Sequence, residues 1–174
     1  MSGRIFLDQQ RLAERVREMG AEIRQDYGSG TPVHFVCVLK GAFVFLADLM
    51  RATAGPVTCD FMAMSSYGSG TTSSGEVRVL KDLDAGLEGR DVVIVEDIVD
   101  TGLTLSYLHE ILKARSPKSL KIACLLSKPS RRKVEVPVDY IGFTIEDKFV
   151  VGYGLDFNEQ YRNLPHIGVL GEES

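Results

Sequence analysis

The sequence predicts an α/β domain with a mostly parallel central sheet flanked by helices. Two patterns that alternate along the chain predict this class. Short apolar runs rich in β-branched residues alternate with segments of helical periodicity, and this alternation continues through most of the chain. The length of 174 residues suits one domain, and neither an internal repeat nor a linker divides it. We therefore expect residues 1–174 to form a single domain.

The first element that the pattern predicts is a helix, with Asp8 as its N-cap and Gly28 as its stop signal. Its apolar residues recur every three or four positions and share one face: Leu12, Val16, Met19, Ile23 and Tyr27. The elements expected next are a buried strand at 33–39, a helix at 42–52 and a strand at 57–64.

Residues 65–76 (SSYGSGTTSSGE) are mostly Gly, Ser and Thr, which cannot bury apolar area, so we expect a mobile loop there. The elements expected beyond it are strands at 77–80, 91–96, 120–127 and 140–145, and a helix at 104–115. Parallel sheets bind ligands at the carboxyl ends of their strands. Functional residues are therefore expected just after Leu39, Glu96 and Ser127.

Composition narrows the class of partner. The formal net charge of -4 and the lack of a basic tail argue against nucleic acid as the main partner, although a local basic patch could bind small phosphates. No stretch is apolar enough to span a bilayer, and the first residues do not resemble a secretory signal, so we expect a cytoplasmic protein without a membrane partner. Cys37, Cys59 and Cys124 are expected to be reduced, buried thiols.

The segment VVIVEDIVDTGLTL (residues 92–105) is the most informative part of the sequence. An apolar strand ends in Glu96 and Asp97, and Asp100 follows just before a predicted helix. Gly102 lets the backbone approach a ligand closely, and the first amides of the helix, its dipole and two threonine hydroxyls make a site for a phosphate. Three carboxylates beside a phosphate would repel it, unless the ligand also offers hydroxyls and a bound divalent cation.

Other interpretations of this segment are weaker. Each acid alone would be interpreted as a solvated strand-end charge or a helix cap, but the whole order after a buried strand favours a functional site. The G-x-x-x-x-G-K-[ST] pattern of ordinary nucleotide hydrolases is absent from the sequence. Gly68, Gly70 and Gly75 match a dinucleotide-binding loop only loosely, because their spacing is wrong and no helical pattern follows.

Residues 92–105 resemble the signature of type I phosphoribosyltransferases. Much of the remaining chain resembles the hypoxanthine-guanine branch of that family, in particular its bacterial members. The segments that carry this resemblance are VLKGAFVFLADL from Val38, SSYGSGTTSSGEV from Ser65, LLSKPS from Leu125 and DKFVVGYGLDFNEQYRNLP from Asp147. The last of them separates this branch from orotate and adenine transferases. The resemblance implies the type I phosphoribosyltransferase fold, with a small hood formed from the chain ends.

The resemblance also implies an activity and its substrates. Phosphoribosyl pyrophosphate and hypoxanthine or guanine would give IMP or GMP and pyrophosphate, with Mg²⁺ as cofactor. The residues that would hold the 5′-phosphate are Thr101, Gly102, Leu103 and Thr104. Glu96 and Asp97 would lie beside the ribose hydroxyls and their magnesium ion, and Asp100 would exchange a proton with N7 of the purine. An upward shift of the Asp100 pKa by Glu96 and Asp97 is a further hypothesis.

Three residues would contact the base. By the resemblance, Lys128 would donate to the 6-oxo group, Phe149 would stack on the ring, and the Val150 carbonyl would accept from the exocyclic amine of guanine. Taken alone, a lysine is more often a surface residue and a phenylalanine more often packs in the core. The place of Lys128 at a strand end, and the DKFVVGYGLD sequence around Phe149, favour the binding roles.

The pyrophosphate side follows from the same resemblance. Asp156 would bind a second magnesium ion, Arg162 would bind the pyrophosphate, and Lys40-Gly41, a peptide that is often cis in the family, would supply backbone amides. Ser66 and Tyr67 would begin a loop that closes over the reacting centre and excludes water.

Some expectations stay open at this stage. Leu103 stands where many relatives carry Lys, Glu146 where Pro is frequent and Ala42 where Gly is frequent, so the base preference is not fixed. The alternatives are a xanthine-preferring transferase, a regulator that senses phosphoribosyl pyrophosphate while binding RNA or DNA, and an inactive homologue. We expect a homodimer or homotetramer. The three histidines, His34, His109 and His166, lack metal-site spacing and are expected to be structural.

Overall fold

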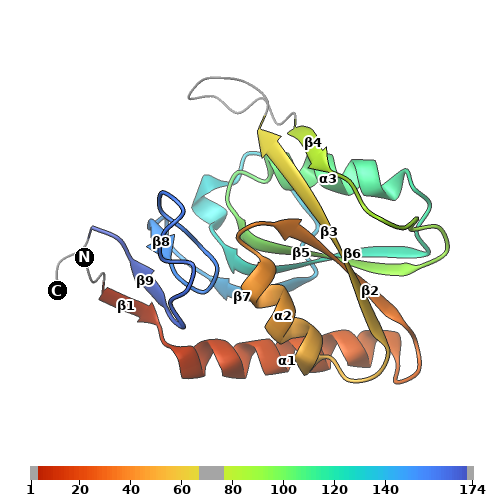
Figure 1. Cartoon of the computed structure of the whole chain (residues 1–174), viewed down its shortest axis with the longest axis horizontal. Helices are drawn as coiled ribbons and strands as arrows, with labels where there is room; N and C mark the ends of the chain where they lie inside the picture. The colour runs from red at the N-terminus through yellow and green to blue at the C-terminus, as the bar shows by residue number, and fades with distance from the viewer. Residues whose placement is uncertain (1–3, 67–76, 172–174) are drawn as a thin grey trace.

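The computed structural model describes residues 4–66 and 77–171. A six-stranded sheet with the order β4-β3-β2-β5-β6-β7 forms its centre (Figure 1). Its strands are β2 (Val33–Leu39), β3 (Val57–Ser66), β4 (Val77–Lys81), β5 (Asp91–Val99), β6 (Ser119–Ser127) and β7 (Tyr140–Thr144). All neighbouring strands pair in parallel except β4, which runs antiparallel to β3 at one edge. The predicted α/β class is therefore confirmed.

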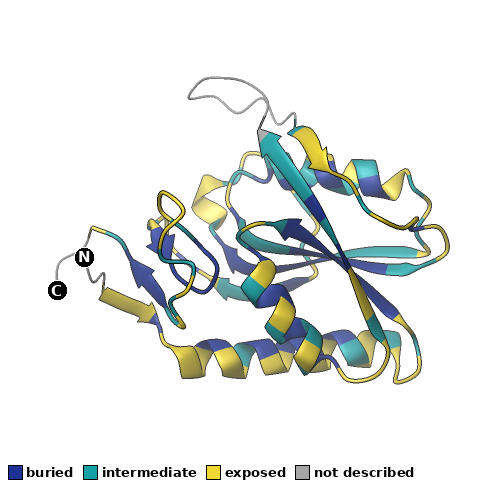
Figure 2. Ribbon diagram, viewed as in Figure 1, coloured by how far each residue is buried: buried dark blue, intermediate teal, exposed yellow. Residues whose placement is uncertain are grey.

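Helices cover both faces of this sheet. Helices α1 (Gln9–Tyr27) and α2 (Phe43–Ala52) pack on one face, together with alternate strand residues such as Phe35 and Val93. Helix α3 (Leu103–Lys113) covers the other face with the intervening residues, such as Val36 and Ile94. Because each central strand is buried on both sides, it consists almost entirely of apolar residues, and Figure 2 shows these strands as the most buried part of the molecule.

The two ends of the chain meet in a second, three-stranded sheet. Its order is β1-β9-β8, with antiparallel pairing, and its strands are β1 (Arg4–Leu7), β8 (Val150–Val151) and β9 (Ile167–Val169). In Figure 1 this small sheet lies apart from the central sheet, at one end of α1. No local pattern predicted these short strands, because each has at most four residues and β1 pairs with a segment more than a hundred positions away.

The helices and strands expected from the sequence are present, with several shifted ends. The N-cap Asp8 accepts the amide of Arg11 at 2.8 Å, and α1 ends before Gly28 as predicted. Helix α3 begins one residue earlier than expected and ends at Lys113, two residues earlier. None of the helices in the described ranges is long and apolar enough to cross a membrane.

Three expectations are corrected. Strand β5 continues to Val99, so Glu96 and Asp97 lie within it rather than at its end. Strand β3 includes Ser65 and Ser66, which were assigned to the loop, and residues 67–76 of that loop lie outside the described part of the chain. Cys59 is exposed, whereas Cys37 and Cys124 are buried as predicted. The reason is that, among the described residues, the next strand β4 pairs with β3 from Ala63 to Ser66, beyond Cys59.

Candidate active site

The carboxyl ends of β2, β5 and β6 meet at one edge of the sheet. The register pairs Cys37 with Val95, and Val99 with Ser127, so the segments that follow these strands emerge side by side. The backbone amide of Lys128 donates to the carbonyl of Val99 at 2.9 Å, which joins the segments after β5 and β6. The edge therefore gathers the three segments in which functional residues were expected.

Two acids lie side by side near the end of β5. The amide of Asp97 donates to Glu96 Oε1 at 3.1 Å, and the amide of Ile98 donates to Asp97 Oδ1 at 2.7 Å. Burial, reinforced by the negative charge of Asp97, raises the pKa of Glu96 well above its usual range. Burial also raises the pKa of Asp97. Two such carboxylates would both ionise readily only beside a cation.

Gly41 approaches this acid pair closely. A Cβ atom at position 41 would lie 1.9 Å from Asp97 Oδ2, so a larger residue there would displace the Asp97 carboxylate. The cis peptide bond of this segment joins Leu39 to Lys40 and not Lys40 to Gly41, so the expected position was one residue too late. The geometry brings the backbone after β2 into contact with the acids of β5.

The turn between β5 and α3 forms a small cradle. Asp100 is exposed, and its Oδ1 accepts the amide of Thr101 at 2.6 Å. Gly102 caps α3 with a φ of 82°, and the amide of Leu103 donates to Thr101 Oγ1 at 3.4 Å. A cavity of about 50 Å³ lies in this turn, lined by Glu96, Ile98, Val99, Asp100, Thr101, Gly102, Thr104 and Leu105. The first-turn amides and hydroxyls around it suit a phosphate-sized anion.

The segment after β6 packs against the turn that forms this cradle. The carbonyl of Thr101 accepts the amide of Lys133 at 2.9 Å, and a Cβ atom on Gly102 would lie 2.8 Å from Val136 Cγ2. Arg132 Nη2 donates to Ser127 Oγ at 2.8 Å, and its Nη1 is buried without a partner among the described residues. Sequence analysis did not select Arg132, because nothing in the local pattern distinguishes it from the exposed Arg131 beside it.

Lys128 and Phe149 differ in how their side chains are held. The Lys128 side chain is only 11% exposed, and its Nζ lies 3.4 Å from Asp147 Oδ1, so it is not an ordinary surface lysine. Phe149 is 54% exposed and makes an edge-to-face contact with Phe157 at a centroid distance of 5.8 Å. An aromatic ring with one free face suits stacking on a planar ligand. Val150 directly follows it as a buried residue of β8.

A cluster of charges lies on the loop after β8. Arg162 Nη1 donates to the carbonyl of Gly154 at 2.7 Å, and its Nη2 lies 3.1 Å from Glu159 Oε1 and 3.4 Å from Asp156 Oδ1. Lys40 Nζ pairs with Glu159 Oε2 at 2.9 Å. Glu159, which was not predicted from the sequence, therefore joins Arg162 to the side chain of Lys40, a residue whose backbone was expected to serve the pyrophosphate.

The remaining predicted residues are placed as follows. Ser66 ends β3, and Tyr67 lies outside the described residues. Within residues 4–66 and 77–171 no three His, Cys, Asp or Glu side chains form a metal-binding group, so Glu96 and Asp97 stay separate from Asp156. The edge thus combines an acid pair, an anion cradle and a loop that carries both Arg162 and two acids, which suits an anionic ligand that carries a divalent cation.

Comparison with known proteins gives consistent results. The model of the phosphoribosyl transferase domain matches residues 2–158. The chain is 50% identical over 167 residues to the hypoxanthine-guanine phosphoribosyltransferase of Bacillus subtilis strain 168, covering 96% of this chain and 92% of that protein. It is 49% identical over 165 residues to the hypoxanthine phosphoribosyltransferase of Salmonella typhimurium, covering 94% and 93%. A crystal structure of a hypoxanthine-guanine phosphoribosyltransferase from Bacillus anthracis has a TM-score of 0.92 at 45% identity, covering 95% and 97%.

Proposed function

The chain belongs to the phosphoribosyltransferase family, and on this premise we propose how it acts as a purine salvage transferase of the hypoxanthine-guanine branch. It transfers the 5-phosphoribosyl group from phosphoribosyl pyrophosphate to N9 of hypoxanthine or guanine, and releases pyrophosphate with IMP or GMP. The observation that carries the proposal is the acid pair Glu96 and Asp97 directly beside the phosphate-sized cradle. One substrate, phosphoribosyl pyrophosphate, presents both the phosphate and the hydroxyls that these groups require.

The 5′-phosphate binds in the cradle at the start of α3. The first amides of the helix and the hydroxyls of Thr101 and Thr104 bind its oxygens, while Gly102 allows the close approach. Leu103 contributes its amide and no charge. Arg132 supports the turn beneath Gly102, since a Cβ atom there would lie 3.3 Å from Arg132 Cδ.

Magnesium fits the acid pair. Glu96 and Asp97 offer hard oxygen ligands, and burial and the charge of Asp97 raise the pKa of Glu96, so a divalent cation would stabilise both ionised carboxylates. These two side chains would hold the ribose hydroxyls and one Mg²⁺ ion, and Asp156 would hold a second. Bound Mg²⁺ would neutralise the charge that grows on pyrophosphate as the glycosidic bond breaks. Arg162 and the backbone of Lys40 and Gly41 bind the same leaving group.

The base lies between Phe149 and the end of β6. Lys128 Nζ donates to the 6-oxo group, the ring of Phe149 stacks on the purine, and the Val150 carbonyl accepts the exocyclic amine of guanine. As N9 forms its bond to C1′, Asp100 accepts the proton that the base releases at N7. Asp100 is exposed at the mouth of the cradle, so it can reach a bound base without rearrangement of β5.

The setting of the enzyme is part of the proposal. Residues 1–174 act as one domain, with the sheet of β1, β9 and β8 as a hood over the base. The protein works in the cytoplasm as a homodimer or homotetramer.

Steady-state turnover with hypoxanthine, guanine, xanthine and adenine tests the activity. We expect turnover with hypoxanthine or guanine and none with adenine, because Lys128 can donate to a 6-oxo group but not to a 6-amino group. A preference for xanthine would mean that xanthine, rather than hypoxanthine or guanine, is the substrate. Lack of turnover with all four bases would contradict the proposed function.

A further inference from the structure

Three consecutive residues with positive φ form a turn directly after β8, next to Arg162 and the Lys40-Gly41 backbone. The φ angles of Gly152, Tyr153 and Gly154 are 101°, 52° and 97°. This region suits glycine but costs a tyrosine roughly 1–2 kcal/mol, so the surrounding contacts must hold Tyr153 in place. Its amide donates to the carbonyl of Leu164 at 2.9 Å, and the neighbouring amide of Gly154 donates to Arg162 at 3.0 Å.

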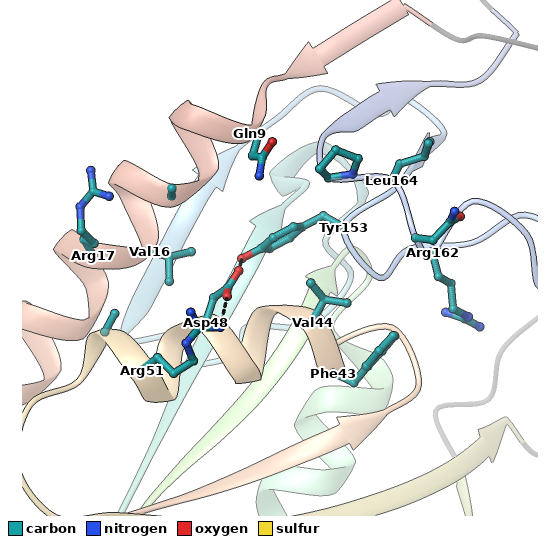
Figure 3. A pocket seen from close by; sticks show the side chains of 14 residues that line it. Gln9, Val16, Arg17, Phe43, Val44, Asp48, Arg51, Tyr153, Arg162 and Leu164 are labelled. Atoms are coloured by element: carbon teal, nitrogen blue, oxygen red, sulfur yellow. Dashed lines mark hydrogen bonds and ion pairs between the residues drawn. The ribbon is translucent and has the colours of Figure 1, made fainter.

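The side chain of Tyr153 is fixed by a helix on the other side of the site. Its hydroxyl points at Asp48 of α2 (Figure 3) and donates to Asp48 Oδ2 at 2.5 Å, and the tyrosine is only 6% exposed. Next to this bond lies a cavity of about 780 Å³ between α1, α2 and residues 162–165. The bond from Tyr153 to Asp48 is therefore a polar tie between the turn and α2 at the edge of this cavity.

The turn contacts both groups that serve the pyrophosphate. The carbonyl of Gly154 accepts Arg162 Nη1 at 2.7 Å. A Cβ atom on Gly154 would lie 2.5 Å from the carbonyl oxygen of Gly41, so the two backbones touch. Helix α2 in turn begins just after Gly41, where the amide of Phe43 donates to Lys40 at 3.1 Å. A shift of the turn relative to α2 would therefore move Arg162 away from the Lys40-Gly41 backbone.

We propose that Asp48 and Tyr153 are positioning residues, which hold Arg162 and the Lys40-Gly41 backbone at the separation that pyrophosphate requires. This inference rests on the proposed function and assigns roles to two residues outside the set that contacts substrate. Neither residue touches the reacting atoms. The hydroxyl-to-carboxylate bond acts through Gly154, which joins the two pyrophosphate-binding groups.

The molecule contains a matched control. Tyr140 donates to Asp26 Oδ2 of α1 at 2.6 Å, and it is 4% exposed. Tyr140 begins the edge strand β7, three strands away from β2 in the sheet order, and its hydroxyl bonds α1 rather than α2. Removal of either hydroxyl deletes a bond from a buried tyrosine to an aspartate on a helix. Only the deletion at Tyr153 removes a bond between α2 and the turn that contacts Arg162.

The test compares Tyr153→Phe with Tyr140→Phe in the full chain, after wild-type turnover is established. We expect Tyr153→Phe to raise the KM for phosphoribosyl pyrophosphate roughly tenfold, with the KM for the base and kcat changed by less than about twofold. Tyr140→Phe should lower the unfolding temperature about as much as Tyr153→Phe does. It should leave the KM for phosphoribosyl pyrophosphate unchanged. Calorimetry with Mg²⁺ and pyrophosphate should report the same weakening for Tyr153→Phe only.

Variants of Asp48 complete the test, and they replace Tyr153→Phe if that variant does not fold. Asp48→Asn keeps an oxygen that accepts the hydroxyl, so most of the affinity should be retained, whereas Asp48→Ala should match Tyr153→Phe. The double variant Asp48→Ala/Tyr153→Phe should be no worse than either single variant, because one bond is removed only once. Equal KM values for Tyr153→Phe, Asp48→Ala and wild type would overturn the inference while leaving the proposed function intact. Absence of wild-type turnover would overturn both.

Discussion

Carboxylates lie towards both ends of the central strands, and the two sets meet different partners. In the amino-terminal half, Asp60 accepts the amides of Phe61 and Asp84 at 2.8 Å each, and Asp91 accepts Ser119 Oγ at 2.6 Å. Near the carboxyl ends, Glu96 and Asp97 lie beside each other, and the donors found for them among the described residues are amides of their own strand. The pKa of Asp60 is lowered, whereas those of Glu96 and Asp97 are raised.

This difference separates acids that stabilise the fold from acids that await a ligand. At Asp60 the chain supplies its own donors, so the charged carboxylate contributes to folding. At Glu96 and Asp97 the chain leaves two buried carboxylates in mutual repulsion, which is unfavourable until a cation is bound. Substitution of Glu96 or Asp97 should therefore mainly reduce turnover. Substitution of Asp60 should mainly reduce stability.

Removal of divalent metal should have the largest effect. We expect turnover to vanish in excess chelator and to return with added Mg²⁺ or Mn²⁺, because Glu96 and Asp97 cannot neutralise the leaving pyrophosphate themselves. Steady-state turnover during a chelator titration measures this, and an unchanged unfolding temperature in chelator would separate loss of the cation from loss of the fold. Full turnover in excess chelator would contradict the assignment of the acid pair.

The next largest effect is expected at Asp100. Asp100→Asn keeps the size of the side chain but removes the proton acceptor, so the chemical step should slow roughly a hundredfold or more. Single-turnover kinetics at saturating substrates measure this step. Binding of phosphoribosyl pyrophosphate should change little, since the phosphate is held by the cradle.

Two controls sharpen this result. Thr104→Val should weaken binding of phosphoribosyl pyrophosphate without a comparable loss in the chemical step, because it removes a hydroxyl that lines the cradle. Asp91→Asn, at the amino end of the same strand, should leave the chemical step unchanged. Normal single-turnover rates for Asp100→Asn would mean that another group accepts the proton, and Asp100 would then only hold the amide of Thr101.

How far the sequence predicts the molecule also differs between its regions. The central strands, the first helix and the turn at 100–104 were predicted because their signals are local: apolar runs, a cap at Asp8 and a glycine at 102. Strands β1, β8 and β9 were not predicted, because each has at most four residues and is defined by pairing between distant segments. The extension of β5 beyond Glu96 to Val99 was missed because acidic residues ordinarily mark a strand end.

The site shows the same division. Residues in continuous motifs were selected, whereas Arg132, Glu159 and the pair of Asp48 and Tyr153 were not. Each of these contacts another segment of the chain: Arg132 lies near Gly102, Glu159 pairs with Lys40, and Asp48 and Tyr153 are 105 positions apart. No spacing within one segment can signal such a contact.

A smaller effect is expected at the base-binding edge. Lys128→Ala should reduce the preference for 6-oxo over 6-amino purines by roughly tenfold or more, since the donor that faces O6 is removed. Arg131→Ala is a close control, because Arg131 also lies 3.4 Å from Asp147 but is far more exposed than Lys128. Relative kcat/KM for hypoxanthine and adenine measures the preference. Unchanged selectivity in Lys128→Ala would return Lys128 to a structural role.

The smallest effect on turnover is expected at Asp60, where the consequence should appear in stability. Burial alone would raise the pKa of Asp60, but the amides of Phe61, Ala85 and Asp84 outweigh it and hold the pKa below its usual range. The charged form is therefore favoured in the folded state. Its contribution is fully present above the unfolded pKa of about 3.9, and it is lost as pH falls through the lower folded pKa.

Asp60→Asn should consequently lower the free energy of unfolding by about 1–3 kcal/mol at pH 7, because an amide cannot accept all three backbone donors. The difference between variant and wild type should narrow as pH falls below about 4, where the wild-type carboxylate takes up its proton. Urea unfolding at pH 7, 5, 4 and 3 measures this difference, with the exposed Glu88→Gln as a control that should show little change. A difference that stays constant with pH would mean that shape rather than charge makes Asp60 stabilising, and a loss of turnover in Asp60→Asn would break the division between the two sets of acids.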